Sequence, residues 1–408
     1  MFVPRKFRFL ARYLNLCFPT KMVQQYIDTL INNLLGLQGY QLILAIVFSG
    51  FFLVRLLYLF LFTGKVLFVR KPAAQKPVSV SLIYTVRNEE ERLRRNLPPV
   101  LSINGVDFEV IVVDDVSQDN TLQVLGMMRE RSDRLKVTML HQETRYSIKM
   151  AQNIAIKASG CEWVLQVPIT YENATYEWIS GITSALGENK NVVIAYTGVL
   201  PEGGMAGFFY RIENFLLFTR SVGYILNGLP FVYAEENVAL LKKKYFEVGG
   251  HGLKINEPYA NLELLINHII RKENTQVLFQ ASTAIKKTEP IRWHDYADLL
   301  KKSIRIEKHL TSSKKLMLAF DEATKLVYFP LLVVVSVLLF SIWPFIALLV
   351  LIQLISRMVI IKMLQNRLSE RKIFISSLLY DLFVPYFRFF YRWVFNQKGQ
   401  KQKWKIKV

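Results

Sequence analysis

The chain has 408 residues, 52% of them hydrophobic, and its 52 Lys and Arg residues outnumber 32 Asp and Glu residues to give a formal net charge of +20. A mean hydropathy of +0.23 is too high for an ordinary soluble enzyme, while the length allows one soluble domain of roughly 250 residues together with membrane segments. The two distant cysteines, Cys17 and Cys161, exclude a disulfide scaffold and a cysteine-based metal site and fit a reducing compartment.

The basic excess flanks the apolar segments and fills the C-terminus, where Lys398, Lys401, Lys403, Lys405 and Lys407 lie. This placement favours an anionic lipid surface as the partner of the positive charge. No nucleic-acid motif accompanies the basic residues, so we do not expect a nucleic-acid partner.

Residues 1–40 mix basic, aromatic and apolar side chains, which predicts a basic amphipathic segment at a membrane interface. They contain no short apolar stretch followed by a small-residue cleavage site, so a cleaved signal peptide is not expected. Translation from Met22 instead of Met1 is an alternative start for the chain.

Residues 41–64 are predicted to form a transmembrane helix, because the run Gln41–Phe62 is apolar over a length that spans a bilayer. Arg55 interrupts the run, and an arginine at this depth is costly unless it reaches the interface or faces protein. Lys65 and Arg70 follow closely, which places the downstream side in the cytoplasm by the positive-inside rule.

Residues 77–310 are predicted to form an α/β domain, because runs rich in β-branched residues alternate with segments of helical spacing. The expected strands are 77–84, 110–113, 135–140, 163–167 and 192–196. The expected helices lie within 87–97, 121–134, 146–159, 172–186, 208–223, 237–248, 261–271 and 293–309. The order β-α-β-α-β with short connections indicates a doubly wound, Rossmann-like sheet.

Residues 326–361 are predicted to form a transmembrane hairpin, because Trp343 and Pro344 divide an apolar run into two short spans. One span before the α/β domain and a hairpin after it leave the domain in the cytoplasm. The basic N-terminus then falls outside, against the positive-inside rule, and this conflict favours the start at Met22.

Residues 373–408 are predicted to comprise an interfacial helix, over 373–395, followed by a basic cytoplasmic tail. Asp381, Arg388 and Arg392 interrupt the apolar character of the helix. Charges at these positions favour a helix in the membrane plane over a further span.

The apolar run Val110–Val113 ends abruptly in two acids, Asp114 and Asp115, and a polar turn follows. This pattern predicts a buried strand that delivers carboxylates at its carboxyl end. In open α/β sheets that edge is where ligands bind. Taken alone, the same pattern also fits a strand that ends in a solvated turn.

Four stretches in a fixed order extend the pattern around these acids. They are YTVRNEEERL at Tyr84–Leu93, IVVDDVSQDNT at Ile111–Thr121, SIKMAQNIAIKASG at Ser147–Gly160 and ENVALLKKKYFEVGG at Glu236–Gly250. Together they resemble the motifs of the family 2 glycosyltransferases of the membrane-anchored, inverting type, which have a GT-A fold. The resemblance covers roughly Pro77–Ile304.

The resemblance implies transfer of a sugar from a nucleotide-diphospho-sugar to a membrane-associated lipid or polysaccharide acceptor. It implies a divalent metal, Mg²⁺ or Mn²⁺, for the leaving diphosphate if the chain is active, and a general base for the acceptor hydroxyl. The positions that it assigns to nucleotide binding are Asn88, Glu90, Asp114, Asp115 and Lys149.

The family's metal-binding Asp-any-Asp motif is not matched. Trp178 corresponds to the tryptophan that follows this motif in the family, and this alignment places Ile169, Thr170 and Tyr171 at the motif. Glu172 lies one residue beyond and is a weak candidate for the site chemistry. The metal ligands therefore stay unknown, and a chain without a metal is the alternative.

The family's catalytic base is not matched either. The acidic pair before an apolar helix falls on Ala260 and Asn261, and an asparagine amide cannot accept the hydroxyl proton. Glu257 and Glu263 are weak candidates for the base.

The family's Gln-any-any-Arg-Trp segment falls on Leu299–Ile304, which has neither the glutamine nor the tryptophan. Lys301, Lys302 and Arg305 are the candidates for binding phosphate as point charges. The alternative for these cations is contact with anionic lipid headgroups.

Two functions therefore remain. The first is an active glycosyltransferase with an altered site, in the cytoplasmic (inner) membrane with its domain facing the cytoplasm. The second is a catalytically inactive pseudo-glycosyltransferase that acts as a scaffold or regulatory subunit of a partner glycosyltransferase or polysaccharide-synthesis protein. The loss of three chemical positions favours the second, and the retained framework favours the first.

Overall fold

The computed structural model describes residues 20–72, 76–143, 147–172, 174–187, 189–200, 204–252, 255–257, 259–371 and 373–397. Residues 1–19 of the predicted basic segment at 1–40, Met1 included, and the basic tail after residue 397 lie outside the described residues. The chain divides into two compact units. The first comprises Met1–Leu57 and Asp321–Arg357, and the second comprises Tyr58–Phe320 and Met358–Val408.

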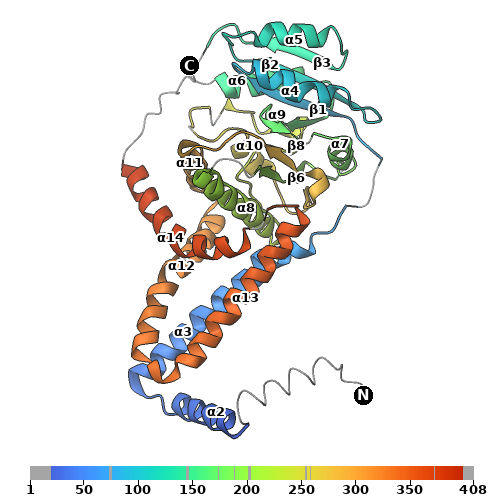
Figure 1. Ribbon diagram of the computed structural model, residues 1–408. Coiled ribbons are helices and arrows are strands. Elements are labelled where there is room, and N and C mark those ends of the chain that lie inside the picture. The colour runs from blue at the N-terminus through green and yellow to red at the C-terminus, as the bar shows by residue number, and fades with distance from the viewer. Residues whose placement is uncertain are drawn as a thin grey trace, which may run out of the picture. The chain divides into compact units, whose positions relative to one another are not determined.

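The first unit is helical (Figure 1). It contains α2 (Thr20–Leu35), most of α3 (Gly39–Tyr58), and the adjoining parts of α12 (Ser312–Leu338) and α13 (Trp343–Arg367). Apolar side chains from these helices, including Phe48, Phe52 and Val335, form a common cluster. Arg55 is buried in this unit, and its guanidinium lies 4.9 Å from the centroid of the Tyr328 ring. An arginine within the apolar helix therefore faces protein, one of the two environments that the sequence allows for it.

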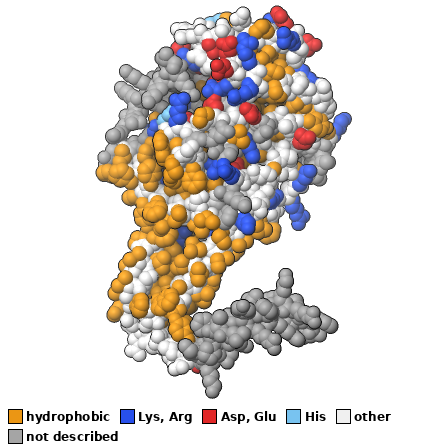
Figure 2. All heavy atoms as spheres, in the orientation of Figure 1, with side chains coloured by type: hydrophobic (Ala, Val, Ile, Leu, Met, Phe, Trp, Pro, Cys, Tyr) orange, Lys and Arg blue, Asp and Glu red, His pale blue; other side chains and the backbone are white. Residues whose placement is uncertain are grey.

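Two helical segments among the described residues are long and apolar enough to cross a membrane, Gly39–Phe68 and Phe340–Arg367. The first contains the transmembrane helix predicted at 41–64. The second begins with a short helical turn, Phe340–Ile342, directly before α13. This is the place at which Trp343 and Pro344 were expected to divide the C-terminal hairpin. Figure 2 shows hydrophobic side chains over the exposed surface of these helices.

The second unit is built on a mixed seven-stranded sheet in the order β3-β2-β1-β4-β8-β6-β9. These strands are β1 (Val80–Val86), β2 (Phe108–Asp114), β3 (Leu135–Met139), β4 (Trp163–Gln166), β6 (Val192–Ala195), β8 (Val238–Leu241) and β9 (Thr275–Leu278). The first four strands are mutually parallel, and β8 runs antiparallel to both β4 and β6. A small second sheet joins β5 (Tyr171–Glu172), β10 (Ile285–Lys287) and β7 (Thr197–Val199).

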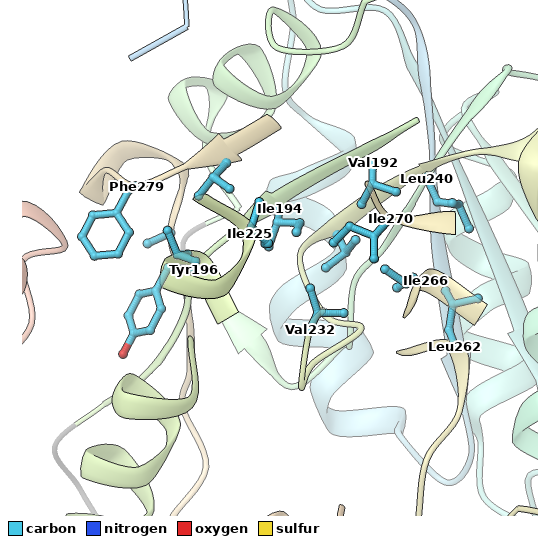
Figure 3. Close-up of a cluster of buried hydrophobic side chains, with 14 of the residues drawn as sticks. Val192, Ile194, Tyr196, Ile225, Val232, Leu240, Leu262, Ile266, Ile270 and Phe279 are labelled. Carbon is cyan, nitrogen blue, oxygen red and sulfur yellow. The ribbon is translucent and has the colours of Figure 1, made fainter. Parts of the chain in front are cut away.

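Helices cover both faces of the large sheet (Figure 1). The helices of the second unit include α4 (Glu90–Leu101), α5 (Thr121–Arg129), α6 (Ser147–Ala158), α7 (Tyr176–Thr183), α8 (Gly204–Leu226), α9 (Lys242–Glu247), α10 (Leu262–Ile269), α11 (Trp293–Lys308) and α14 (Phe374–Gln397), the last of which contacts α8 and α11. Along β2, Val110 and Val112 belong to one buried cluster, while Ile111 and Val113 belong to another. A strand buried on both faces explains why its sequence is a continuous apolar run. Figure 3 shows part of the second cluster, between β6, β8 and the helices.

The helix predicted over 237–248 is wrong in its first part. Val238–Leu241 form β8, and only Lys242–Glu247 are helical. The four apolar residues of β8 lie fully between two neighbouring strands, with Val238 paired to Gln166 and to Ile194. Pairing with strands distant in sequence therefore overrides the local helical spacing.

Gly223 of α8 lies against the backbone of Phe62, so a methyl group at this position would meet the Phe62 carbonyl at less than contact distance. We expect Gly223→Ala to lower the free energy of unfolding by about 1–3 kcal/mol through overpacking, measured by denaturant titration. Gly126→Ala is the matched control, since that position in α5 has open space and alanine favours a helix. Equal stability of the two variants would contradict the close helix contact.

Candidate active site

The carboxyl ends of the parallel strands meet at one edge of the sheet. Val86 at the end of β1 is paired with Asp114 at the end of β2. Because β8 is antiparallel to β4 and pairs Val238 with Gln166, the residues that precede β8 reach the same edge. Those residues are Glu235 and Glu236, and neither was among the predicted site residues.

Asp114 is fully buried and closes the turn after β2. Its carboxylate accepts a hydrogen bond of 3.0 Å from the Ser117 amide and a short one from the Ser117 hydroxyl. Val116 between them has a φ of 55°, a conformation that a branched residue rarely adopts. The side chain of Asp114 therefore holds a strained turn in place.

Asp115 is buried at the same edge, and its amide donates to the Val86 carbonyl over 2.8 Å. The pKa of Arg87 is raised above its ordinary value, first by the hydrogen bond to Glu143 over 2.9 Å and further by the charges of Asp115 and Asp114. The aspartates and Arg87 therefore form one charged group at the strand ends.

The loop after β1 is joined to the loop after β2 by side chains. Asn88 receives a hydrogen bond of 2.7 Å from the Gln118 amide, and its own amide donates to the Ser117 hydroxyl over 2.9 Å. Glu90 accepts from the Asn120 side chain over 2.9 Å. Asn88 does not cap helix α4, because Glu89 occupies the N-cap position and Asn88 has a left-handed φ of 52°. The side chain of Asn88 crosses to the other loop instead.

An acid cluster, which we define as Glu235, Glu236 and Glu263 with Lys302, lies around the start of α10. Glu235 accepts a 2.7 Å hydrogen bond from the Leu262 amide, and Glu263 accepts a 2.7 Å bond from the Asn261 amide. Lys302 of α11 forms a short ion pair with Glu263 and a longer one, of 3.7 Å, with Glu236. The position of the family's base, Asn261, is thus beside two glutamates.

Burial and the neighbouring Glu263 raise the pKa of Glu235 to about 8. Burial alone would lower the pKa of Lys302, but the surrounding carboxylates outweigh it and raise that pKa well above its usual value. A carboxyl group that titrates near neutral pH beside a permanently charged lysine suits proton transfer.

We expect the stability of the chain to fall as the pH rises from about 5 to about 8, because a carboxyl group with a raised folded-state pKa must ionise against its environment. The stabilising effect of neutral Glu235 is fully present below the ordinary carboxyl pKa and is lost as the pH passes the folded value. Melting temperatures across this range should decline more steeply for the unmodified chain than for Glu235→Gln. The same dependence of melting temperature on pH in both proteins would contradict the raised pKa of Glu235.

Lys149 of α6 is buried and donates to the Glu257 carbonyl over 2.7 Å and to the Ile255 carbonyl over 3.3 Å. Burial lowers its pKa, while the charges of Glu263, Glu257 and Glu235 oppose that shift. The predicted nucleotide-binding lysine therefore lies within electrostatic reach of the acid cluster.

His251 is a second residue that the sequence did not single out. It is buried beside the Tyr245 ring, with 5.8 Å between ring centroids. Burial, and after it the charge of Lys149, lowers the pKa of His251 to about 3, so the ring is neutral at physiological pH.

The position of the family's metal motif does not fit a carboxylate-held cation. Ile169 is buried, and its carbonyl accepts a 2.6 Å hydrogen bond from the Asn96 side chain. Tyr171 and Glu172 form β5, and the carboxylate of Glu172 lies 3.4 Å from Arg95 at a partly exposed surface. Among the described residues, no group of three His, Cys, Asp or Glu side chains is arranged to hold a metal ion.

The remaining candidates are held in ion pairs. Lys301 pairs with Asp298 over 2.8 Å. Glu257 lies 3.6 Å from Arg305 and 2.8 Å from His309. Phosphate binding by Lys301, Lys302 or Arg305 stays a prediction, and each of these cations would have to share its charge with a carboxylate.

Residues 81–167 match the family model described as Glycosyl transferase family 2. These residues include β1, β2 and the aspartates at the strand ends. No curated protein matches the sequence.

Among solved structures, the mannosyltransferase PcManGT from Pyrobaculum calidifontis, in complex with GDP-Man and Mn2+, is similar at a TM-score of 0.50 and 15% identity, covering 83% of this chain and 98% of that one. TarS 1-349 of S. aureus in complex with UDP-GlcNAc gives 0.43 and 17%, covering 80% and 93%. Glucosyl-3-phosphoglycerate synthase from Mycobacterium tuberculosis, in complex with Mn2+, UDP-Glc and phosphoglyceric acid, gives 0.38 and 14%, covering 57% and 79%.

The mixed α/β sheet has the expected GT-A fold, and the family match falls on its first strands and their acidic turn. The similarity to glycosyl transferase family 2 therefore lies in residues 81–167, within a chain that has the GT-A fold.

Proposed function

We propose that the chain is a membrane-anchored glycosyltransferase of the cytoplasmic membrane, with its domain on the cytoplasmic side. It binds a nucleotide-diphospho-sugar at the edge that carries Asp114 and Asp115, and it transfers the sugar to a lipid or polysaccharide acceptor at the membrane. The observation that carries the proposal is the acid cluster, because it places a carboxyl group of raised pKa at the same sheet edge as the aspartates of the matched domain.

In this proposal Glu235 takes the role that Asn261 cannot perform. Glu235 lies within 3.5 Å of the Asn261 side chain, at the start of the same helix. Asp115 faces the nucleotide, while Asp114 keeps the turn in shape. The residues at the family's metal motif do not fit a divalent cation, so the proposed binding of the nucleotide does not depend on one.

Two observations favour the second candidate, an inactive pseudo-glycosyltransferase that supports an active partner. The candidate base Glu263 is tied to Lys302, and the metal motif holds Ile169 in place of a carboxylate. Co-purification with an active glycosyltransferase, together with absence of turnover by the purified chain, would support this candidate over the first.

The experiment that tests the proposed function is calorimetric titration of the detergent-solubilised chain with UDP, GDP and their sugars, with Mn²⁺, with Mg²⁺ and with EDTA. We expect binding of one nucleotide with an affinity that EDTA does not change. Release of nucleoside diphosphate on addition of a membrane-lipid extract then separates the active enzyme from the pseudoenzyme. Absence of binding by every nucleotide would overturn both candidates.

The two aspartates are expected to respond differently to substitution. Asp115→Ala should weaken nucleotide binding at least tenfold, because a contact to a charged acceptor contributes about 1.5–3 kcal/mol, with little change in melting temperature. Asp114→Ala should instead lower stability by about 1–3 kcal/mol, since Ser117 loses its buried acceptor. Titration and thermal melting of both variants check the assignment, and equal effects of the two would contradict it.

A further inference from the structure

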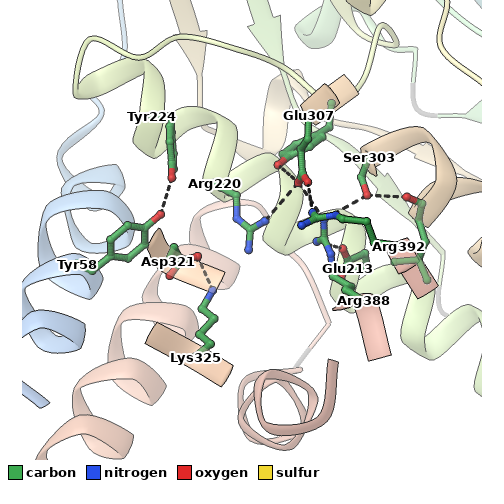
Figure 4. Close-up of polar contacts among 12 residues, drawn as sticks. Tyr58, Glu213, Arg220, Tyr224, Ser303, Glu307, Asp321, Lys325, Arg388 and Arg392 are labelled. Carbon is green, nitrogen blue, oxygen red and sulfur yellow. Dashed lines mark hydrogen bonds and ion pairs between the residues drawn. The ribbon is translucent and has the colours of Figure 1, made fainter. Parts of the chain in front are cut away.

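Helix α14 presents two chemically different faces within the second unit. Its buried face carries Tyr380 and Arg388, which meet the carboxylate of Glu213 on α8 over 2.7 and 2.9 Å. Arg388 also lies 2.9 Å from Glu307 of α11, and Arg392 lies 2.7 Å from the same residue (Figure 4). Two acids from two helices thus hold α14 by its charged face.

The opposite face of α14 is an exposed apolar stripe. Its members are Ile375, Leu379, Phe383, Phe387, Phe390 and Trp393. They recur every three or four residues, so they follow one side of the helix. Phe383 is 66% exposed and Phe390 is 60% exposed. An exposed apolar stripe of this length, on a helix whose polar face is buried, indicates a surface that contacts another molecule or a membrane.

The start of α14 lies close to the ends of both candidate membrane spans. Arg367, the last residue of α13, donates to the Leu67 carbonyl over 2.7 Å and to the Val69 carbonyl over 2.6 Å. Both spans therefore end at one level within the second unit. Only six residues separate Arg367 from Phe374, where α14 begins. This short connection keeps the start of α14 near the level at which the spans leave the membrane.

We propose that the apolar stripe of α14 lies in the headgroup layer of the bilayer, with the helix in the membrane plane. The inference rests on the membrane anchoring in the proposed function and adds a second contact with lipid. Lipid is the occupant that the observations favour, because the stripe combines phenylalanine with tryptophan, the helix starts at the span ends, and lysines follow it in the sequence. The same lysines suit anionic headgroups.

This arrangement would connect the lipid surface to the candidate active site. Arg388 contacts Glu307, and Glu307 lies on α11 together with Lys302 of the acid cluster. A helix that is held by lipid on one side and by Glu307 on the other would fix α11 with respect to the membrane. An acceptor in the bilayer would then meet the acid cluster at a fixed height.

The test uses the full chain in nanodiscs, with Cys17 and Cys161 replaced by serine and one cysteine introduced for an environment-sensitive fluorophore. The positions are Phe383→Cys on the stripe, Leu351→Cys in α13 as the control for anchoring, and Glu130→Cys at the exposed residue that follows α5. Lipids brominated near the headgroup or near the chain end report the depth of each label by quenching.

We expect the label at 383 to be quenched at least twofold more by shallow than by deep bromines, the label at 351 mainly by deep bromines, and the label at 130 by neither. Quenching at 351 without quenching at 383 would overturn the inference and leave membrane anchoring intact. Deep quenching at 383 would make α14 a further span, and disulfide formation between two copies at 383 would make the stripe a self-association surface; either result overturns the inference. Absence of quenching at 351 would overturn the anchoring itself.

Discussion

Replacing Lys302 by methionine is expected to lower the free energy of unfolding by about 3–5 kcal/mol, because it leaves the fully buried Glu263 without its cation. Methionine keeps most of the volume of lysine, so the lower free energy of unfolding comes from the missing charge and not from a cavity. Glu236 and Glu263 would both lose the cation with which they are paired. Urea unfolding of the full chain in detergent, followed by tryptophan fluorescence, measures the change.

Lys301→Met is the matched control. Lys301 is the preceding residue on the same helix and pairs with Asp298, whose side chain is 53% exposed. An ion pair of this kind contributes about 0–1 kcal/mol, so the control should be nearly silent. The double variant Lys302→Met with Glu263→Gln should recover most of the stability. Equal losses at positions 301 and 302 would contradict a buried charge cluster.

The sheet was largely predictable because its central strands are buried on both faces. Continuous apolar runs such as Val110–Val113 carry that information locally. The start of β8 could not be predicted, because its four apolar residues fit a helix equally well and only the two flanking strands decide between them. The interfacial position of residues 373–395 stays a prediction, whereas the contacts of α14 with Glu213 and Glu307 show which face of the helix is buried, and the sequence alone did not reveal them.

The two parts of the candidate site differ in how well they could be predicted from the sequence. Asp114, Asp115 and Lys149 follow from motif order, since parallel strands bring their carboxyl ends together. Glu235 could not be assigned, because its raised pKa depends on Glu263, on Lys302 and on burial, which are tertiary properties. The one local signal was the acidic pair Glu235-Glu236, one residue before the apolar run of β8, which reverses the order found at the end of β2. Because β8 runs antiparallel to β4, acids that precede β8 lie at the same sheet edge as acids that follow β2.

Replacing Glu235 by glutamine is expected to lower kcat for sugar transfer by about 10²–10⁴ while nucleotide-sugar affinity stays within a few fold. The glutamine amide keeps the shape of the side chain and can still accept from the Leu262 amide, but it cannot take up a proton. In the proposed step the acceptor hydroxyl gives its proton to Glu235, the acceptor oxygen bonds to the anomeric carbon, and the bond from that carbon to the diphosphate breaks with its electron pair on the diphosphate.

The pH profile separates this role from a structural one. The base must be ionised, and its pKa is about 8, so the wild-type kcat should rise with pH up to about 8 and then level off. Glu235→Gln should remove that rise. Glu247→Gln is the control, since Glu247 is a surface residue paired with Lys244, and it should leave both kcat and the profile unchanged. A full pH-dependent rise in Glu235→Gln would contradict the role of Glu235 as the base. A chain that binds the nucleotide and shows no turnover in any form would instead favour the pseudoenzyme, in which Glu235 affects only stability.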